Sequence, residues 1–541
     1  MLKYRFAIKS KALSLAIQRH QSTASASIIE GLDVLENKDI LPCTRAFINN
    51  EYVESSSTFD VPEDNMFEVL NPSTLKPITK VHNMGVSDYN KAIDIAHKTF
   101  EETRYHITPR DRSQWLYKMY ELFNENRLDL AKIITLENGK TLKDSLSEVD
   151  YSASYFRWFA EEAPRIYGSI ISSSSSLSSL QAAGSTSKEV HARRQPLGVV
   201  GILTPWNFPS AMIARKLSVA LATGNSCVIK PAKETPLSGL AYGWLAKQAD
   251  VPAGLVNILP TTYADSIGKL IVGNNLIKKV SFTGSTNIGK LLLKQGMSLD
   301  SNDTLKKYSM ELGGNAPFII DQTADLDKAL IGLVNAKFRQ SGQTCICANR
   351  VYVHEDIHDK FAGMLKTYIE GNFKLGDGFD SMVTHGPLIH SKAIDKVAAL
   401  VQDAKVKGAK ILLGGTRASS VGPLFYHPTI LTDVDDSMKI FHEEIFGPVC
   451  SLIKYSGSLD SVIEECNKSD VGLASYFYSQ DVQSIHKVTQ QLECGMIGVN
   501  SGSISDAALP FGGVKNSGFG REGSLYGIED YTEVKSVVYE Y

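Results

Sequence analysis

Short apolar runs rich in β-branched residues alternate with helical patterns from Ala192 onward. The spacing predicts strands at 198–203, 227–230, 255–260, 278–284, 316–320 and 351–353, with helices at about 209–224, at about 238–250 and from Asp325. Strand–helix alternation of this kind indicates parallel sheets covered by helices on both faces. Because the alternation restarts after Gly314, we expect two α/β domains in sequence.

The chain before Ala192 has a different pattern. Residues from about 109 to 165 form a charged helical stretch, and the segment ISSSSSLSSL at 171–180 has too little apolar content to form a core. We expect this serine-rich segment to be an exposed connection or an edge hairpin. No repeat of fixed period is visible, so a solenoid or a propeller is not supported.

Length and charge narrow the function classes. With 541 residues and 43% hydrophobic content, the chain is long enough for two or three packed domains. Its 56 Lys and Arg against 59 Asp and Glu give a net charge of -3, without the basic excess that binds phosphate backbones. The uncharged run between Lys216 and Lys230 is too short and too polar to cross a bilayer. We therefore expect neither nucleic acid nor a membrane as a partner.

Cysteine usage and the N-terminus indicate the compartment. The seven cysteines lack the paired spacing of a disulfide framework or a zinc ribbon, which favours free thiols in a reducing compartment. Residues 1–25 carry five scattered basic residues, several serines and no acid before Glu30. This composition is typical of a mitochondrial transit peptide, so we expect the mitochondrial matrix. A disordered basic tail on a cytoplasmic protein is the alternative.

Two motifs are similar to nucleotide-binding loops. GSTNIGK at 284–290 follows a predicted strand, but Leu291 stands where a Walker A loop needs a Ser or Thr hydroxyl for magnesium. We therefore expect a strand-to-helix turn that cradles phosphates without hydrolysing nucleotides. GFGREG at 518–523 matches G-x-G-x-x-G, but no strand precedes it and no βαβ unit fits after it. We expect a loop there.

A third motif, HEDIH at 354–358, has the spacing of zinc peptidase ligands. Those two histidines must lie one turn apart on a single helix to reach the same metal. Here Asp356 is the expected helix N-cap, which places His354 before the helix and His358 within it. We therefore expect no metal site.

One cysteine has the surroundings of a nucleophile. In FRQSGQTCICANR at 338–350 a predicted helix ends at Ser341 and Gly342, and Cys345 follows among small and polar residues. Structural cysteines usually lie in apolar runs, as Cys450 does in PVCSLI. A thiol in a polar turn can be accessible and partly ionised, which nucleophilic catalysis requires. This segment alone leaves a structural and a catalytic role equally open.

After residue 25 the chain resembles an aldehyde dehydrogenase over essentially its whole length. The resemblance rests on motifs in the order and spacing of that superfamily, namely TPWNFP (204–209), KPAKETP (230–236), FTGSTNIG (282–289), MELGGNAPFI (310–319), GQTC (342–345), EEIFGP (443–448) and PFGGVKNSGFGRE (510–522). Within the superfamily, the chain most resembles succinate-semialdehyde dehydrogenases, through RQSGQTCICANR, VGLASYFYSQD (471–481) and GREGSLYGIEDY (520–531). The implied reaction is oxidation of succinate semialdehyde to succinate, as in 4-aminobutyrate degradation. Glutarate semialdehyde or an uncharged aldehyde is the alternative substrate.

The resemblance implies catalytic roles for four residues. Cys345 would attack the aldehyde carbon to form a thiohemiacetal, and loss of hydride to the nicotinamide would leave a thioester. The Asn207 side chain and the backbone N–H of Cys345 would donate to the oxyanion. Glu311 would activate the water that hydrolyses the thioester. Lys216 would lie near the same pocket.

The resemblance also implies a dinucleotide site. The matching positions are Lys230, Pro231, Ala232 and Lys233 at the adenosine ribose, Gly284, Ser285, Thr286 and Gly289 at the phosphates, and Trp206, Leu312, Glu444 and Phe446 around the nicotinamide and its ribose. Lys233 departs from NAD-preferring members, which have a glutamate at that position. Because two lysines would attract a 2'-phosphate, we expect NADP, with NAD as a second cofactor.

For the substrate, the resemblance points to Arg215, Arg339 and Ser505 as the residues that hold the distal carboxylate. Charge-assisted hydrogen bonds of this kind are worth roughly 1.5 to 3 kcal/mol each. The alternative is that both arginines form surface ion pairs. Cys347, two residues past the nucleophile, is expected to be a small packed residue, with a reversible disulfide to Cys345 as the alternative.

The strand pattern and the resemblance together imply an α/β fold in three parts. A Rossmann-like cofactor-binding domain would comprise 26–168 and 192–311, and a parallel-sheet catalytic domain would comprise 312–524. A small β element formed by 169–191 and 525–541 would join subunits into a homodimer or homotetramer.

Overall fold

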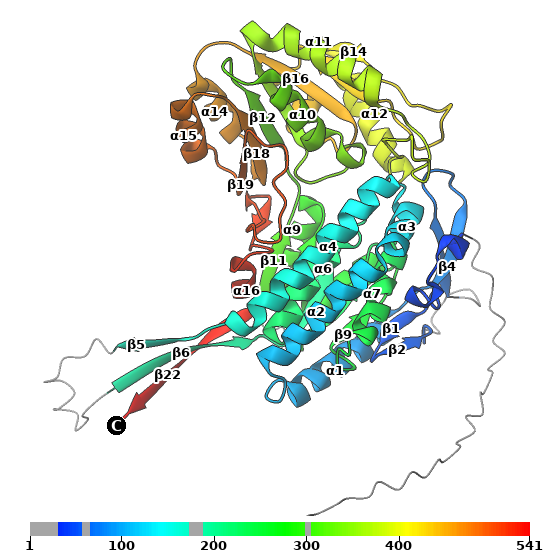
Figure 1. The fold of residues 1–541 in the computed structure, drawn as a ribbon, viewed down its shortest axis with the longest axis vertical. Helices are drawn as coiled ribbons and strands as arrows, with labels where there is room; N and C mark the ends of the chain where they lie inside the picture. Colours follow the sequence, from blue (N-terminus) through cyan, green and yellow to red (C-terminus); the bar gives the residue numbers. More distant parts are fainter. Residues whose placement is uncertain (1–30, 57–64, 173–187, 298–304) are drawn as a thin grey trace, which may run out of the picture.

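The computed structural model describes residues 31–56, 65–172, 188–297 and 305–541, which form two α/β lobes and a projecting three-stranded arm (Figure 1). The expected transit peptide at 1–25 and most of the serine-rich segment at 171–180 lie outside the described residues. In the part of the chain that is described, no helix is both long and apolar enough to cross a membrane.

The first lobe is built on an eight-stranded sheet whose five central strands are parallel, as predicted. In spatial order the strands are β2 (Glu51–Val53), β1 (Ala46–Ile48), β9 (Val256–Ile258), β8 (Ser226–Lys230), β7 (Val199–Leu203), β10 (Ile277–Thr283), β11 (Lys307–Glu311) and β21 (Gly518–Phe519). Strands β1, β2 and β21 pair antiparallel at the edges. Strand β21 comes from the segment 312–524, which was expected to form the catalytic domain. That segment therefore contributes a strand to the sheet of the first lobe.

Helices cover both faces of this sheet (Figure 1). They are α1 (Val86–Thr103), α2 (Pro109–Glu125), α3 (Arg127–Asn138), α4 (Leu142–Glu162), α6 (Ala211–Thr223), α7 (Pro236–Gln248), α8 (Ala264–Gly273) and α9 (Thr286–Gly296). The single helical stretch expected at 109–165 is three helices, because local signals interrupt it. Left-handed Gly139 ends α3, and the Thr141 side chain accepts from the backbone of Asp144 to begin α4.

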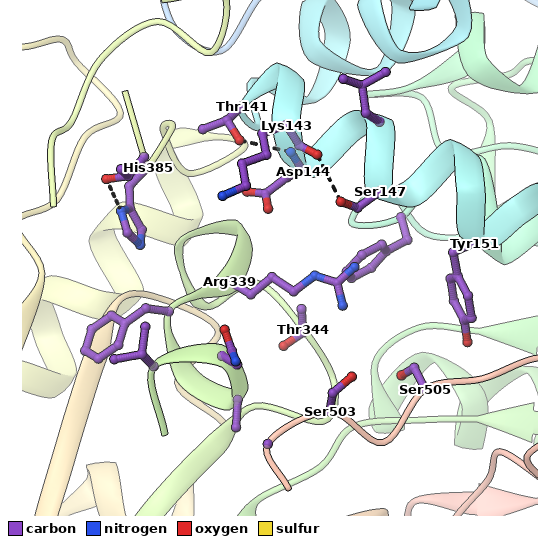
Figure 2. Close-up of a pocket in the computed structure, with 18 of the residues that line it drawn as sticks. Thr141, Lys143, Asp144, Ser147, Tyr151, Arg339, Thr344, His385, Ser503 and Ser505 are labelled. Atoms are coloured by element: carbon purple, nitrogen blue, oxygen red, sulfur yellow. Dashed lines mark hydrogen bonds between the residues drawn. The ribbon is translucent and has the colours of Figure 1, made fainter. Parts of the chain in front are cut away.

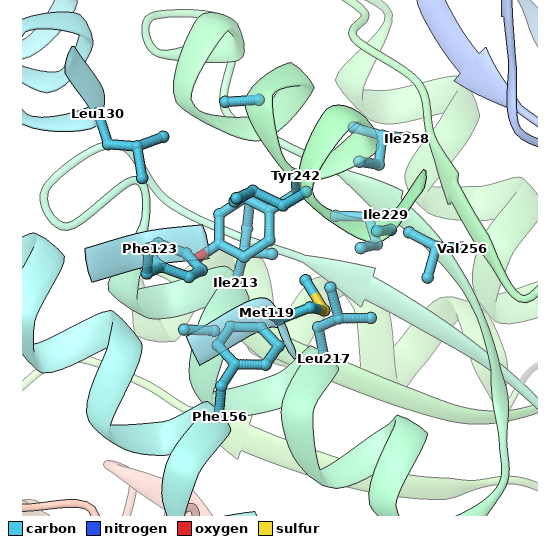
Figure 3. Close-up of a cluster of buried hydrophobic side chains, with 14 of the residues drawn as sticks. Met119, Phe123, Leu130, Phe156, Ile213, Leu217, Ile229, Tyr242, Val256 and Ile258 are labelled. Atoms are coloured by element: carbon cyan, nitrogen blue, oxygen red, sulfur yellow. The ribbon is translucent and has the colours of Figure 1, made fainter. Parts of the chain in front are cut away.

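The core of the first lobe joins helices α2, α3, α4, α6 and α7 to the sheet (Figure 3). Phe123 of α2 stacks on Phe156 of α4 with ring centroids 5.4 Å apart, and Tyr242 of α7 packs edge-on at 5.5 Å. Ile213 of α6 and Ile229 of β8 complete the cluster. This packing fixes α4, α6 and the carboxyl end of β8 relative to one another, and these elements carry much of the candidate site.

The second lobe is a seven-stranded sheet with one antiparallel edge strand, β14. In spatial order its strands are β14 (Lys410–Leu413), β15 (Thr429–Thr432), β16 (Val449–Tyr455), β13 (Ala348–His354), β12 (Ala316–Ile320), β18 (Ala474–Tyr478) and β19 (Met496–Val499). Its helices are α10 (Leu326–Lys337), α11 (Glu355–Asn372), α12 (Ser391–Val406), α13 (Lys439–His442), α14 (Leu459–Asn467) and α15 (Val482–Gln491). The predicted two-domain α/β class is thus confirmed, with mixed instead of purely parallel sheets.

The arm is a three-stranded antiparallel sheet that projects from the first lobe (Figure 1). It contains β5 (Ser169–Ser172), β6 (Lys188–Pro196) and β22 (Thr532–Glu540), so the expected β element is present. The remaining short elements are η1 (Leu32–Val34), η2 (Lys38–Ile40), η3 (Ala163–Arg165), η4 (Arg339–Gly342), β3 (Met66–Leu70), β4 (Pro77–His82), β17 (Val471–Gly472), β20 (Val514–Lys515) and α16 (Tyr526–Asp530).

Two local predictions need correction. The N-cap of α11 is His354 and not Asp356, because the imidazole Nδ1 accepts the Asp356 N–H at 3.4 Å. His354 therefore still precedes the helix that contains His358. The GFGREG segment is not only a loop, since Gly518 and Phe519 form β21 against the otherwise open edge of β11. Gly518 has a φ of 107°, and a Cβ there would collide with the Met310 carbonyl.

Candidate active site

The segment that presents Cys345 is a kinked turn between α10 and β13. Gln340, Ser341 and Gly342 all adopt left-handed backbone angles, with φ of 52°, 53° and 76°. Such angles are costly for residues other than glycine and are found at functional sites where surrounding contacts hold them. Here the Ser341 hydroxyl donates to the Gly386 carbonyl at 2.7 Å. The kink turns the chain so that Cys345 lines a cavity instead of continuing the helix.

That cavity has a volume of about 950 Å³ and brings together four predicted residues: Cys345, Arg215, Arg339 and Ser505. Figure 2 shows the Arg339 side chain running across it, with Ser503, Ser505 and Tyr151 grouped beyond the guanidinium and His385 on the opposite side. The sequence interpretation did not include the further polar residues of the wall, which are Thr141, Lys143, Asp144, Ser147, Tyr151, Thr344, Thr384, His385 and Ser503.

The Cys345 thiol is less acidic than the sequence suggested. The pKa of this thiol is raised to about 12, mainly by burial and also by the nearby carboxylates of Glu444 and Glu311, while the Arg215 cation opposes the rise. The expected partly ionised thiol stays a prediction. Cys345 is half-buried where it lines the cavity, and the hydration that an anion loses there favours the neutral thiol.

The Asn207 side-chain amide is held in one orientation. Its Oδ1 accepts the Phe208 N–H at 3.1 Å, and its Nδ2 donates to the Gln343 carbonyl at 3.2 Å. An amide nitrogen carries two hydrogens, so one remains for another acceptor. Asn207 thus contacts the backbone just before Cys345, where a donor to an oxyanion on that residue is needed.

Glu311 ends β11 as a buried carboxyl. Neither of its oxygens has a hydrogen-bond partner among the described residues. Burial raises its pKa well above the usual range, and the neighbouring negative charge of Glu522 adds to this effect, while Arg215 and Lys216 oppose it. A Cβ on Gly512 would lie 2.9 Å from Glu311 Oε1, so only glycine at 512 leaves room beside the carboxyl. In its ionised form, a carboxyl without a hydrogen-bond partner can accept a proton from water.

Glu522 is a buried carboxylate that the sequence interpretation missed. It accepts from Lys216 Nζ, which also donates to Thr283 Oγ1 at 2.6 Å. Arg215 Nε lies 2.8 Å from Glu522 Oε2, at ion-pair distance but not aligned as a hydrogen bond. Lys216 therefore lies beside Glu311 within a charge cluster. The only sequence signal was an acid next to Arg521 in GFGREG, which gave no indication of its partners.

Arg339 differs from Arg215 in having no carboxylate partner among the described residues. Its guanidinium lies 5.3 Å from the centre of the Phe208 ring, which supports it without neutralising its charge. The two arginines that were expected to bind the substrate carboxylate therefore differ in their surroundings. Arg339 is a cation of the cavity wall without an ion-pair partner among the described residues, whereas Arg215 shares the Glu522 carboxylate with Lys216.

The predicted cofactor residues lie apart from this cavity, at the carboxyl edge of the first sheet. Lys230 ends β8 in a buried position, and burial lowers its pKa to about 8, with Glu234 raising it and Lys233 lowering it. Pro231 and Ala232 follow under α7, and a Cβ on Gly239 would lie 2.8 Å from Pro231 Cβ. Lys233 is exposed in the same turn. The two lysines thus combine one buried and one exposed cation.

The predicted phosphate-binding turn is the N-terminus of α9. Gly284 follows β10, and Ser285 is the N-cap, but its side chain makes no capping hydrogen bond in the described structure. Thr286 Oγ1 instead accepts the Gly313 N–H at 3.2 Å. Gly289 lies against Leu312, whose Cδ2 would be 2.5 Å from a Cβ at that position. A first helical turn without a side-chain cap fits an anion, because its N–H groups need acceptors.

The remaining predicted cofactor residues come from both lobes. The rings of Trp206 and Phe446 pack edge to face with centroids 5.5 Å apart. Glu444 Oε1 accepts the Gly314 N–H at 3.2 Å, and burial raises the pKa of this carboxyl to about 7. This hydrogen bond places Glu444 beside the segment 312–314, which begins with Leu312. This arrangement provides an aromatic wall and a carboxyl that can accept from a ribose hydroxyl, so the residues fit a dinucleotide.

Cys347 is buried and its thiol is engaged with the backbone. Its Sγ donates at 3.3 Å towards the carbonyls of Lys337 and Gly342, and it accepts from the Thr344 hydroxyl at 3.1 Å. These contacts agree with a packed small residue that braces the kinked turn. A disulfide to Cys345 stays an untested alternative.

Comparison with known proteins gives a consistent picture. The family model described as "Aldehyde dehydrogenase family" matches residues 60–537. The chain is 48% identical over 475 residues to "Succinate-semialdehyde dehydrogenase [NADP(+)]" of Saccharomyces cerevisiae, covering 88% of this chain and 92% of that protein. It is 44% identical to "3-sulfolactaldehyde dehydrogenase" of Pseudomonas putida, covering 93% and 99%. The crystal structure of succinate-semialdehyde dehydrogenase from Burkholderia pseudomallei superposes with a TM-score of 0.87 at 39% identity, covering 94% of this chain and all of that one.

Proposed function

This chain belongs to the aldehyde dehydrogenase family, and from that premise we propose that it oxidises succinate semialdehyde to succinate with NADP. The observation that carries the substrate assignment is one cavity lined by both Cys345 and Arg339. This cavity suits a molecule with an aldehyde at one end and a carboxylate at the other, because it offers the Cys345 thiol and the Arg339 cation. The sulfonate of 3-sulfolactaldehyde has the same charge, so relatives with either substrate share this requirement.

The reaction follows from the positions of three side chains. The Cys345 sulfur, once deprotonated, adds to the aldehyde carbon, and the carbonyl oxygen becomes an oxyanion that the Asn207 amide and the Cys345 N–H stabilise. The C–H bond of that carbon then breaks, the hydride leaves, and a thioester remains on Cys345. Glu311 takes a proton from water, which attacks the thioester carbon, so that the acid departs and the thiol is regenerated.

NADP, when bound, would supply the acceptor for the hydride. Glu444 and the Trp206–Phe446 aromatic pair would hold the reactive end of the dinucleotide, and the N-terminus of α9 would hold its phosphates.

Lys233 supports NADP as the preferred cofactor. It is exposed next to buried Lys230, so a 2'-phosphate on the ribose would meet a cation instead of a carboxylate. We expect kcat/KM for NADP to exceed that for NAD. Lys233→Glu should reverse the preference, and an unchanged ratio in that variant would remove Lys233 from the assignment.

A steady-state substrate panel tests the proposed reaction. Succinate semialdehyde is expected to give the highest kcat/KM, followed by glutarate semialdehyde and then butyraldehyde, which lacks a charge for Arg339. If 3-sulfolactaldehyde exceeds all three, the anion subsite is right and the proposed substrate is wrong. If butyraldehyde matches the charged aldehydes, the role of Arg339 fails as well.

Assembly and location complete the proposal. Ile170 and Val538 of the arm are 70% and 61% exposed, and apolar strand residues in such positions are typical of subunit contacts. A homodimer or homotetramer joined through the arm is therefore proposed, to be tested by light scattering of wild type and Val538→Lys. The basic composition of residues 1–25 supports import into the mitochondrial matrix, with the cytoplasm as the alternative.

A further inference from the structure

A buried ion pair holds the turn that carries Asn207. Lys140 Nζ lies 2.5 Å from Glu148 Oε2, and both side chains are at most 1% exposed. Lys140 also donates to the Asn207 carbonyl at 2.8 Å. The other oxygen of Glu148 accepts the N–H groups of Ser210 and Ala211, at 2.8 and 3.1 Å. The pair therefore holds the middle of the turn between β7 and α6 and the start of α6.

Both members of the pair come from rigid parts of the first lobe. Lys140 lies in the short link between α3 and α4, and Glu148 lies two turns into α4. The Lys140 ammonium also lies 4.3 Å from the centre of the Phe208 ring, which adds a contact in the middle of the same turn. Burying two charges costs much of what their attraction gains, so the pair is a weak way to stabilise a fold. Its distinctive effect is on the direction of the groups that it binds.

A second donor reaches the same carbonyl from the other lobe. Gln340, in the kinked turn before Cys345, donates from Nε2 to the Asn207 carbonyl oxygen. The carbonyl of Asn207 is thus shared between Lys140 of the first lobe and the turn that presents the nucleophile. Its position sets the separation between the Asn207 side chain and Cys345.

We propose that Lys140 and Glu148 are positioning residues that aim the Asn207 amide at the oxyanion formed on the Cys345 adduct. This inference rests on the proposed function, because it requires an oxyanion at that place. Neither residue touches the substrate or takes part in a covalent step. Since the donor matters most when negative charge develops, the pair acts on the rate of hydride release and little on the binding of either substrate.

The test uses a variant that removes both charges together. In Lys140→Met/Glu148→Leu no unpaired charge is left buried, so the chain is expected to fold. The pre-steady-state burst of NADPH is expected to slow by up to roughly 100-fold, the cost of misplacing a catalytic group by about 1 Å. KM for the aldehyde and Kd for NADP should change by less than about twofold, because uniform binding is unaffected. Lys140→Arg, which keeps the cation, should recover part of the burst rate.

Two readouts separate positioning from general damage. Alkylation of Cys345 by iodoacetamide needs the thiol but no oxyanion donor, so its rate should match wild type in the double variant. Lys132→Met serves as the control, because Lys132 forms an ion pair with Asp129 within α3 at 3.1 Å and has no contact with Asn207. Its burst should equal that of wild type. Alkylation and burst falling together would overturn the proposal in favour of a structural role.

A mutant cycle with Asn207→Ala decides whether the pair acts through Asn207. If it does, the double variant should slow the burst no further once Asn207 is alanine. A full additional loss in that background would overturn the positioning role while leaving the proposed function intact. If Asn207→Ala alone leaves the burst unchanged, the oxyanion assignment fails, and this inference fails with it.

Discussion

Arg215 and Arg339 line the same cavity, yet their surroundings are opposite. Arg215 is almost fully buried on α6 and lies at ion-pair distance from Glu522. Arg339 crosses the cavity (Figure 2) and has no carboxylate partner among the described residues. The sequence assigned both to the substrate carboxylate. Their environments instead separate a cation that organises the catalytic groups from one that is available to a ligand.

The charges around Arg215 explain its part in the site. Glu522 is the carboxylate that Arg215 and Lys216 share, and Arg215 in turn lowers the pKa of the Cys345 thiol and opposes the rise in that of Glu311. Arg215 therefore affects Cys345 and Glu311, which the proposed reaction uses for every aldehyde. Arg339 has no such ties, so its removal should be felt only by substrates that carry a negative charge.

The largest expected effect comes from removing the Glu522 carboxylate, which Arg215 and Lys216 share. Glu522→Gln leaves two buried cations without their anion, and the free energy of unfolding should fall by about 3 to 5 kcal/mol. Urea unfolding measures this loss. Glu529→Gln is the matched control, because Glu529 pairs with Arg194 at an exposed position, where the change should stay below about 1 kcal/mol. Equal losses in both variants would contradict the contrast between a buried and an exposed pair.

Removing the Arg339 cation should change the selectivity among aldehydes instead of the stability of the fold. Arg339→Met is expected to lower kcat/KM for succinate semialdehyde roughly 10- to 100-fold, the equivalent of one lost charge-assisted bond. Butyraldehyde should be affected less than about twofold, because it offers no carboxylate. Arg215→Met provides the comparison and should lower kcat/KM for both aldehydes to a similar extent. A selective loss in Arg215→Met would reverse the assignment of the two arginines.

Among the variants, the smallest expected effect is on the alkylation of Cys345 before cofactor binds. Because the Cys345 pKa lies at about 12, the thiolate fraction and the rate of alkylation by iodoacetamide should rise about tenfold per pH unit from pH 7 to 10. Arg215→Met removes a charge that lowers this pKa, so alkylation at pH 8 should become slower. Arg339→Met should leave it unchanged. A plateau in the alkylation rate below pH 9 would contradict the raised pKa.

Much of the fold was predictable because it depends on local pattern. The apolar runs at 198–203 and 227–230 are strands β7 and β8, and the turn at Gly284 begins α9, as expected. The helical stretch at 109–165 was right in kind but divided by Gly139 and Thr141, whose backbone and side chain act within a single turn. Strand β21 was missed, since its pairing depends on an edge of β11 that lies about 200 residues earlier in the chain.

For the site, the sequence by itself indicated which residues are the candidates for the reacting groups. The family motifs around Cys345, Asn207 and Glu311 carry the chemistry in their residue types. Only the tertiary structure decided the charge states, because these depend on partners and burial. Lys216 and Glu522 meet across 306 residues, and Lys140 reaches the Asn207 carbonyl across 67. Electrostatic energy depends on distance and dielectric in space, and a linear pattern contains neither.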